Sequence, residues 1–271
     1  MKNYNNFNKN YLRYSIFDWD DNILIMDTKI KMEYNNNNKW IRKSVSTSEF
    51  AKIKNNNWGN GKWKFSVETG LVDFYDNGPR GNRAFLEDVI DSVNKQNFGP
   101  SWNKFIQTLV DGELFAIVTT RGHEPDTIKK GIEYIIYHYL NDEQQNTMLK
   151  NLMRFKDIFD ESFDYLIDEY LNNCYFIGVT SNYFKSKFKD YGTNIHLAKK
   201  KAVKYVIEKF SNYGKQIDSN VKIGFSDDDN KYIDTIQNLF IRNSELFDNI
   251  NFYIFNTSNP NIKGGRKFKI N

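Results

Sequence analysis

A short apolar run that ends in three closely spaced carboxylates constrains this chain more than any other feature. Residues 12–17 are mainly apolar, and Asp18, Asp20 and Asp21 follow within four positions before apolar residues resume at Ile23. This pattern is typical of a buried strand that delivers acidic side chains to its carboxyl end. Because carboxylates this close repel one another, we expect a cation beside them, and Mg²⁺ with oxygen ligands is the first candidate. A solvated acidic turn is the alternative that this stretch leaves open by itself.

Four further apolar segments predict strands that alternate with helices. They cover residues 114–118, 175–180, 221–225 and 251–255, and helical periodicity marks the intervening segments 82–95, 101–109, 126–140, 198–210 and 234–240. This alternation predicts an α/β fold with a central parallel sheet flanked by helices. Ligands bind such sheets outside the carboxyl ends of the strands. Polar residues fall at these ends in three places, which favours a site over a solvated turn: Asp18 and Asp20, Thr119, and Asp227 and Asp228.

Two segments depart from the simple alternation. Residues 28–78 contain long Asn-rich stretches and an alternating segment at 62–67, and they predict a β-rich insert that acts as a cap or flap. Its Trp40, Trp58 and Trp63 are expected to form a small core of the insert, with a pocket lining as the less favoured reading. Residues 139–172 predict a helical elaboration. The core then comprises residues 12–27 and 79–258, and we expect loose termini at 1–11 and 263–271.

Composition narrows the expected environment and partners. The formal net charge of +4 permits an anionic substrate, so a small phosphorylated compound fits, whereas a nucleic-acid partner is compatible but not favoured. The single cysteine, Cys174, excludes an intramolecular disulfide and suits a reducing compartment as a small buried residue. The first ten residues lack an apolar core, so we expect no signal peptide there, and no segment approaches the roughly 18 apolar residues of a membrane span. We therefore expect a soluble, cytoplasmic protein without a membrane partner; the oligomeric state is not indicated.

The polar residues at the strand ends are suited to phosphoryl transfer. Asp18 could attack phosphorus as a nucleophile, and Asp20 could protonate the leaving oxygen and later deprotonate a water molecule. Thr119 could donate a hydrogen bond to the phosphoryl group. A lysine at the start of a helix, with Lys199 preferred over its two neighbours, could neutralise phosphoryl charge and hold Asp18. A Mg²⁺ ion could bind Asp18, the backbone carbonyl of Asp20, Asp227 and Asp228.

The chain resembles the haloacid dehalogenase (HAD) superfamily at four motifs in the order of that family. They are Asp18-Trp19-Asp20-Asp21-Asn22 after an apolar strand, the strand that ends at Thr119, the helix-initial Lys199, and Asp227-Asp228 after another strand. The resemblance covers residues 12–255. It implies a Rossmann-like core and a Mg²⁺-dependent phosphatase that works through an aspartyl-phosphate, because the acid at position 20 is typical of the phosphatases of the family. The inserts correspond in place to its caps but match no known cap type.

Some alternatives stay open at the level of sequence. Asn22 replaces the usual Thr or Val of the first motif, and we expect it to shape the turn. A nucleic-acid end phosphatase and a non-catalytic binding protein of the same fold are the alternative functions. Thr120 and Arg121 are candidate substrate-binding residues, although Arg121 could equally pair with an acid at the rim. His123 is expected to face solvent, and four other residues are expected to serve turns, surfaces or outer contacts: Arg80, Arg83, Asp21 and Asp229.

Overall fold

A six-stranded, mostly parallel sheet forms the centre of the protein, for which we analysed a computed structural model. The structure describes residues 11–56, 61–156, 161–188, 194–259 and 261–270. The strand order is β6-β5-β1-β7-β8-β9, and all neighbouring pairs are parallel except β8 with β9. The strands are β1 (Tyr11–Phe17), β5 (Phe115–Thr119), β6 (Tyr175–Gly178), β7 (Asn220–Asp227), β8 (Ile250–Asn256) and β9 (Arg266–Lys269). The prediction of an α/β fold with a central sheet is therefore confirmed, with one antiparallel edge strand added.

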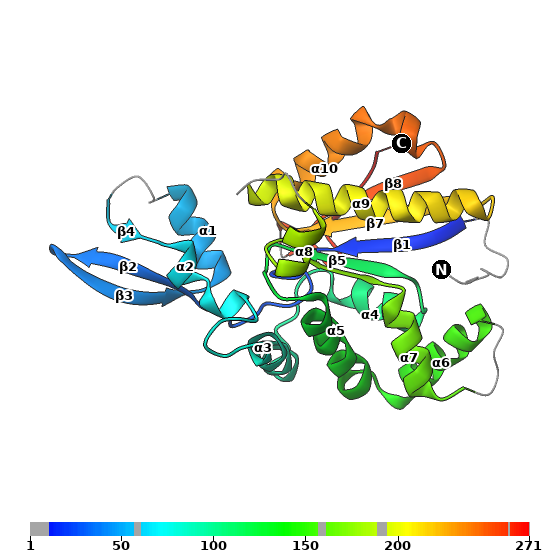
Figure 1. The fold of residues 1–271 in the computed structure, drawn as a ribbon, viewed down its shortest axis with the longest axis horizontal. Coiled ribbons are helices and arrows are strands. Elements are labelled where there is room, and N and C mark those ends of the chain that lie inside the picture. The colour runs from blue at the N-terminus through cyan, green and yellow to red at the C-terminus, as the bar shows by residue number, and fades with distance from the viewer. Residues whose placement is uncertain (1–10, 57–60, 157–160, 189–193, 260, 271) are drawn as a thin grey trace.

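Helices cover both faces of this sheet (Figure 1). On one face lie α9 (Ile195–Gln216) and α10 (Asn230–Arg242). On the other lie α3 (Arg83–Asn94), α4 (Trp102–Val110), α5 (Pro125–Tyr134), α6 (Asp142–Lys156) and α7 (Phe163–Asn172). A π-helical turn at Ile135–Tyr139 follows α5, and the short helix α8 (Asn182–Lys187) follows β6. This layered arrangement explains why β5 is buried along its whole length.

Aromatic and aliphatic side chains bind α9 to the sheet. The buried residues of α9 recur at helical spacing, from Ala198 and Ala202 to Val206 and Phe210. The ring of Phe210 stacks on Tyr14 of β1 with centroids 3.9 Å apart. Asn194 begins the helix by accepting hydrogen bonds from two backbone amides of the first turn. The packing fixes which face of α9 is turned towards the sheet, and this decides where Lys199 points.

A separate small unit lies between β1 and α3. Strands β2 (Ile30–Asn36), β3 (Lys39–Val45) and β4 (Trp63–Lys64) form an antiparallel sheet in the order β3-β2-β4. Helix α1 (Thr47–Asn56), helix α2 (Val67–Gly70) and a 3-10 turn at Val72–Phe74 complete it. The unit has its own apolar cluster, and Figure 1 shows it beside the carboxyl ends of the central strands. We call residues 28–78 the insert.

The structure differs from the sequence-based expectation at several points. The segment 263–271, expected to be a loose end, contains β9, which pairs with β8. The Asn-rich stretch around residue 55, expected to be a loop, lies partly in α1, which was not predicted. Trp63 packs against the apolar cluster of the insert. Trp58 and the first ten residues of the expected loose terminus at 1–11 lie outside the described residues, and Tyr11 already belongs to β1. Cys174 is buried, as expected.

Candidate active site

The turn after β1 fixes the position of Asp18. The amide of Asp18 donates to the carbonyl of Ser226 on β7, and the amides of Ile23 and Leu24 donate to the carbonyl of Trp19. Asp21 has a φ of 56°, a left-handed conformation that reverses the chain direction and is tolerated best by Gly, Asn and Asp. The turn therefore leaves Asp18 buried at the carboxyl end of β1, between its neighbours β5 and β7.

Lys199 is the lysine that reaches Asp18. Its Nζ atom lies 2.7 Å from Oδ1 of Asp18 and 2.7 Å from Oδ2 of Asp227. The residue is buried, whereas Lys200 and Lys201 are partly exposed. Burial by itself would lower the pKa of Lys199, but the carboxylates of Asp18 and Asp227 outweigh it and raise that pKa. Among the three consecutive lysines, the structure thus selects the one that the sequence favoured, as a permanently charged partner of two acids.

Three carboxylates gather around this lysine. One oxygen from each of Asp18, Asp227 and Asp228 falls in a group whose members all lie within 4.8 Å of one another. Burial raises the pKa of Asp18 and of Asp227, although Lys199 acts in the opposite direction. Burial and then the neighbouring Asp227 raise the pKa of Asp228 to about 7. A single ammonium group is insufficient compensation for three clustered carboxylates, so the site favours an additional cation.

A buried carboxylate oxygen of the cluster has spare lone pairs, which supports a cation at this place. Asp227 is fully buried, and its Oδ1 accepts from the amide of Asp229. Its Oδ2 forms the ion pair with Lys199 at 2.7 Å and has no further partner among the described residues. A buried carboxylate oxygen with spare lone pairs beside two other acids is the donor set that Mg²⁺ prefers. The three carboxylates therefore fit the expected metal.

Asp20 does not share these contacts, because Arg121 holds it. The Nε and Nη2 atoms of Arg121 lie 2.8 Å and 2.6 Å from the two oxygens of Asp20, which is a bidentate pair. Arg121 is 1% exposed, and its guanidinium lies over the ring of Phe74 at 4.6 Å and that of Phe85 at 5.6 Å. The sequence left two roles open for Arg121, substrate binding or pairing with an acid at the rim. The structure shows that it pairs with an acid, but in the interior of the protein. The Asp20 side chain is not part of the cluster of three carboxylates.

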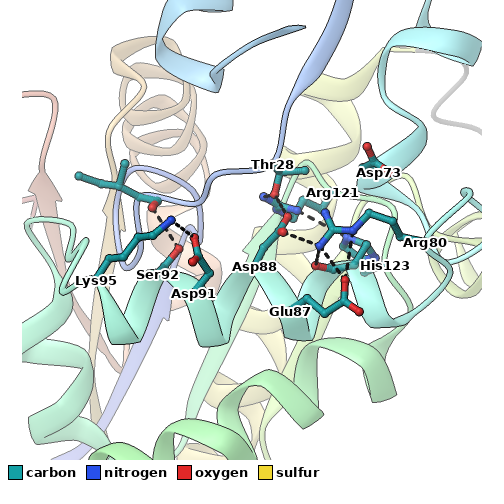
Figure 2. Close-up of polar contacts among 12 residues, drawn as sticks. Thr28, Asp73, Arg80, Glu87, Asp88, Asp91, Ser92, Lys95, Arg121 and His123 are labelled. Carbon is teal, nitrogen blue, oxygen red and sulfur yellow. Dashed lines mark hydrogen bonds and ion pairs between the residues drawn. The ribbon is translucent and has the colours of Figure 1, made fainter.

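A series of hydrogen-bonded side chains also holds Arg121 (Figure 2). Arg121 Nη2 donates to the hydroxyl of Thr28 at 2.8 Å, and Thr28 in turn donates to Asp88 of α3. Arg80 donates to the other oxygen of Asp88 at 2.7 Å and also pairs with Glu87. Thr28 is the first residue of the insert, so the network joins the entrance of the insert to α3 and to the loop after β5. Arg80 is thereby placed in this network rather than on an isolated surface.

His123 is a second buried partner of Arg121, contrary to the expectation of a solvent-facing histidine. The residue has no exposed surface, and its Nδ1 lies 2.8 Å from Asp76. Burial and then the charge of Arg121 lower its pKa, with Asp76 opposing them. In the neutral ring, donation from Nδ1 to Asp76 leaves Nε2 to accept from Nη1 of Arg121, 3.5 Å away. Asp76 also accepts from Thr127 and the amide of Glu124 at the start of α5. The loop after β5 is therefore held at both ends.

Asn22 forms hydrogen bonds with residues from four segments of the chain next to the site. Its Nδ2 donates to the carbonyl oxygens of Asp18 and Ser226, and its Oδ1 accepts from the hydroxyls of Ser101, Ser226 and Thr257. The residue has no exposed surface. Sequence reasoning assigned it only a turn. The Ser101 hydroxyl also lies 2.6 Å from that of Ser226, and it makes no capping bond to the first turn of α4.

The other residues that the sequence singled out make fewer side-chain contacts. Thr119 is buried at the end of β5, and its hydroxyl accepts from the amide of Arg121 at 3.3 Å. The side chain of Thr120 is exposed, and its carbonyl accepts from the hydroxyl of Thr180. Asp21 accepts from Thr47 at the start of α1, which ties the insert to the turn. Asp229 caps α10, and Arg83 is exposed at the start of α3.

Comparisons with known proteins add no relative. No protein-family model matches the chain, no curated protein resembles it, and no solved structure aligns with it. Within the described part of the chain, no helix is both long enough and apolar enough to pass through a bilayer.

Proposed function

We propose that this protein is a Mg²⁺-dependent phosphatase of the HAD type that hydrolyses a phosphomonoester through an aspartyl-phosphate on Asp18. The observation that carries the proposal is the buried group of Asp18, Asp227 and Asp228 around Lys199, at the carboxyl edge of a parallel sheet. Three acids and one fixed cation at this edge match what phosphoryl transfer needs, namely a nucleophile, charge compensation and a metal site. The order of these residues along the chain also agrees with the family resemblance.

In this mechanism Asp18 attacks phosphorus with one carboxylate oxygen. Lys199 holds that carboxylate in place through its Oδ1 and supplies positive charge for the transferring phosphoryl group. The buried Thr119 lies at the end of the adjacent strand, where its hydroxyl can donate to a phosphoryl oxygen. Asp18, Asp227 and Asp228 would hold Mg²⁺, which when bound screens the repulsion between the anionic nucleophile and the anionic substrate.

Asp20 is the general acid and the general base of this mechanism. It protonates the leaving oxygen in the first step and removes a proton from the attacking water in the second. Arg121 contacts both of its oxygens, but each oxygen has a second lone pair, so the pair orients Asp20 without using all of its acceptor sites. The supporting contacts of Arg121 with Thr28 and His123 keep this orientation fixed. Arg121 is accordingly a positioning residue for Asp20.

The test is phosphate release from a panel of phosphomonoesters, measured with Mg²⁺ and with EDTA. We expect turnover of the wild type that EDTA abolishes and added Mg²⁺ restores, and no turnover by Asp18→Asn. Asp248→Asn is the matched control, because Asp248 is exposed, pairs with Lys215 and precedes the amino end of β8, at the edge of the sheet opposite the site. Equal turnover by Asp18→Asn and Asp248→Asn would overturn the proposal, as would activity that is independent of the metal.

A further inference from the structure

Lys199 contacts an aromatic ring as well as the two carboxylates. Its Nζ atom lies 4.2 Å from the centre of the Tyr232 ring, in addition to its contacts of 2.7 Å with Asp18 and Asp227. An ammonium group has three N–H donors, and carboxylate oxygens take up two of its sides. The ring of Tyr232 occupies a further side and, together with the two acids, encloses the ammonium group in the interior.

The backbone that carries Tyr232 is fixed to the same group of acids. Tyr232 is the third residue of α10, which follows β7. Asp229 caps this helix by accepting from the amide of Lys231, and its own amide donates to Oδ1 of Asp227 at 3.0 Å. The first turn of α10 is thus tied to one of the candidate metal ligands. The ring of Tyr232 is therefore held at a defined place relative to the site.

A second residue of α9 contacts the same ring. His196 lies one turn before Lys199, and residues three apart share one face of a helix. The rings of His196 and Tyr232 are 4.7 Å apart and inclined at 32°. Helices α9 and α10 lie side by side on the sheet (Figure 1). Tyr232 therefore joins the beginnings of the two helices at the edge where Asp18 lies.

Tyr232 is buried without being part of the apolar core. It is 6% exposed, yet among the described residues the main apolar cluster includes its neighbours Ile233 and Ile236 and not Tyr232 itself. Burial raises the pKa of Tyr232, although Lys199 opposes this, so the side chain remains a neutral phenol. It consequently offers the ammonium group a ring face rather than a negative charge.

Burial makes this contact stronger than similar contacts elsewhere in the chain. Lys199 is 1% exposed, whereas the lysines that lie over the rings of Trp40 and Tyr253 are exposed. A ring attracts a cation more strongly when water is excluded, because solvation of the cation no longer competes. Loss of the Tyr232 ring would open a space beside the ammonium group, and Lys199 would no longer be confined to its position between the two acids.

We propose that Tyr232 is a positioning residue of the active site, whose ring confines the ammonium group of Lys199 between the two carboxylates. The kinetic consequences rest on the proposed phosphatase function, whereas the contact between the ring and the ammonium group does not. Tyr232 acts through Lys199 and does not touch the substrate. Its loss therefore lowers kcat more than it changes KM.

Release of phosphate from p-nitrophenyl phosphate with Mg²⁺ measures the effect of the ring. Tyr232→Leu removes the ring and keeps an apolar side chain, and we expect kcat to fall by about 10–30-fold, the effect of one buried cation–π contact. Tyr232→Phe keeps the ring, so its kcat should stay within about threefold of the wild type. If Tyr232→Phe lowers kcat as much as Tyr232→Leu does, the proposal is overturned, because the hydroxyl group and not the ring would then matter.

Fluorinated phenylalanines incorporated at position 232 separate the electrostatic role of the ring from its packing. Fluorine withdraws electrons from the ring face and weakens its attraction for a cation, while the ring keeps nearly the same shape. We expect log kcat to fall stepwise as fluorine atoms are added one at a time. An unchanged kcat along this series would overturn the proposal, because a ring that only fills space is insensitive to this change.

A double-mutant cycle in EDTA tests the contact without catalysis. Urea unfolding gives the midpoints of Tyr232→Leu, of Lys199→Met and of the double variant. The shift caused by Tyr232→Leu should be smaller in the Lys199→Met background, because no ammonium group remains for the ring to contact. Tyr253→Leu is the matched control, since the Tyr253 ring of β8 contacts the exposed Lys267 at 4.5 Å. It should keep the wild-type kcat and shift the midpoint equally in both backgrounds.

The two kinds of experiment separate failure of this inference from failure of the proposed function. Turnover by the wild type, combined with equal shifts of Tyr232→Leu in both backgrounds, would contradict the role of Tyr232 alone. A smaller shift in the Lys199→Met background, without turnover of any phosphomonoester by the wild type, would support the contact and contradict the function alone.

Discussion

The Nζ atom of Lys199 lies 2.7 Å from Oδ1 of Asp18, and both side chains are buried. Removal of the lysine leaves two buried carboxylates, those of Asp18 and Asp227, without their cation. Loss of one partner of a buried ion pair typically costs about 3–5 kcal/mol. We expect Lys199→Met to lower the free energy of unfolding by this amount in EDTA and to abolish turnover.

Lys200→Met is the control for this variant, because Lys200 occupies the next position of α9 and is partly exposed. It should change the free energy of unfolding by no more than about 0.5 kcal/mol. Both variants are measured by urea unfolding, followed by circular dichroism. Similar losses in Lys199→Met and Lys200→Met would contradict the assignment of Lys199 to the site.

The bidentate pair of Arg121 with Asp20 predicts a leaving-group effect. Arg121→Lys keeps the charge but cannot reproduce the planar two-point contact, so Asp20 loses its orientation. We expect turnover of an alkyl phosphate to fall by about 10–100-fold, because its leaving oxygen requires a proton. Turnover of p-nitrophenyl phosphate should fall less, since nitrophenolate leaves without protonation.

Arg83→Lys provides the matched control for Arg121→Lys, as Arg83 is exposed at the start of α3. It should retain the wild-type kinetics on both substrates. If Arg121→Lys lowers turnover of the alkyl phosphate and of p-nitrophenyl phosphate by the same factor, Arg121 acts on the fold or on substrate binding and does not orient the proton donor.

The bonds of Asn22 predict that Thr, the residue type of the HAD motif that this segment resembles, will destabilise the protein at this position. Asn22→Thr removes the amide that donates to two carbonyl oxygens and displaces the oxygen that three hydroxyls share. Each buried group left unsatisfied costs about 1–3 kcal/mol. We expect a loss of at least about 2 kcal/mol in urea unfolding. Asn238→Ala, on an exposed face of α10, should cost far less, and a stable Asn22→Thr variant would show that the hydroxyls find other partners.

The clustered acids predict that the metal-free protein becomes less stable as the pH rises. The pKa of Asp228 is raised to about 7 in the folded protein by burial and then by Asp227, and it is about 3.9 in an unfolded chain. Between these values the folded state binds more protons than the unfolded state, so the free energy of unfolding falls with increasing pH. The stabilisation is full below about pH 4 and is lost above about pH 7.

Thermal unfolding at about pH 6 and about pH 8, with EDTA or with Mg²⁺, measures this effect. The Tm in EDTA should be lower at the higher pH, and Mg²⁺ should raise it more there, because protons and metal compete for the same carboxylates. Asp228→Asn should reduce the difference between the two pH values. The same pH dependence of Tm in the wild type and in Asp228→Asn, measured in EDTA, would contradict the raised pKa of Asp228.

Local patterns were sufficient to predict the core of the site. Asp18, Thr119 and Asp227 each follow a buried strand, and the carboxyl ends of parallel strands meet at one edge. Lys199 could be preferred because Ala198, Ala202 and Val203 place it on the apolar stripe of a helix. These conclusions depend on periodicity and order, which a single sequence contains.

The supporting contacts could not be predicted in the same way, because their partners come from distant segments. His123 looked like a loop residue, and its burial depends on Asp76, which lies 47 positions earlier. Asn22 looked like a turn residue, and its role depends on Thr257, 235 positions later. Strand β9 was missed for another reason: its residues are all exposed, so they show no alternation of burial, and only pairing with β8 defines the strand.

Acid-quenched mass spectrometry of the working enzyme tests the central claim most directly. Wild type and Asp20→Asn are mixed with substrate and Mg²⁺, quenched within one turnover, digested and analysed for a phosphoryl group on the peptide that contains Asp18. We predict that the modification forms on Asp18 in both proteins and accumulates in Asp20→Asn, because that variant cannot activate the water that hydrolyses the intermediate. Turnover without any phosphoryl group on Asp18, or turnover retained by Asp18→Asn, would contradict the account.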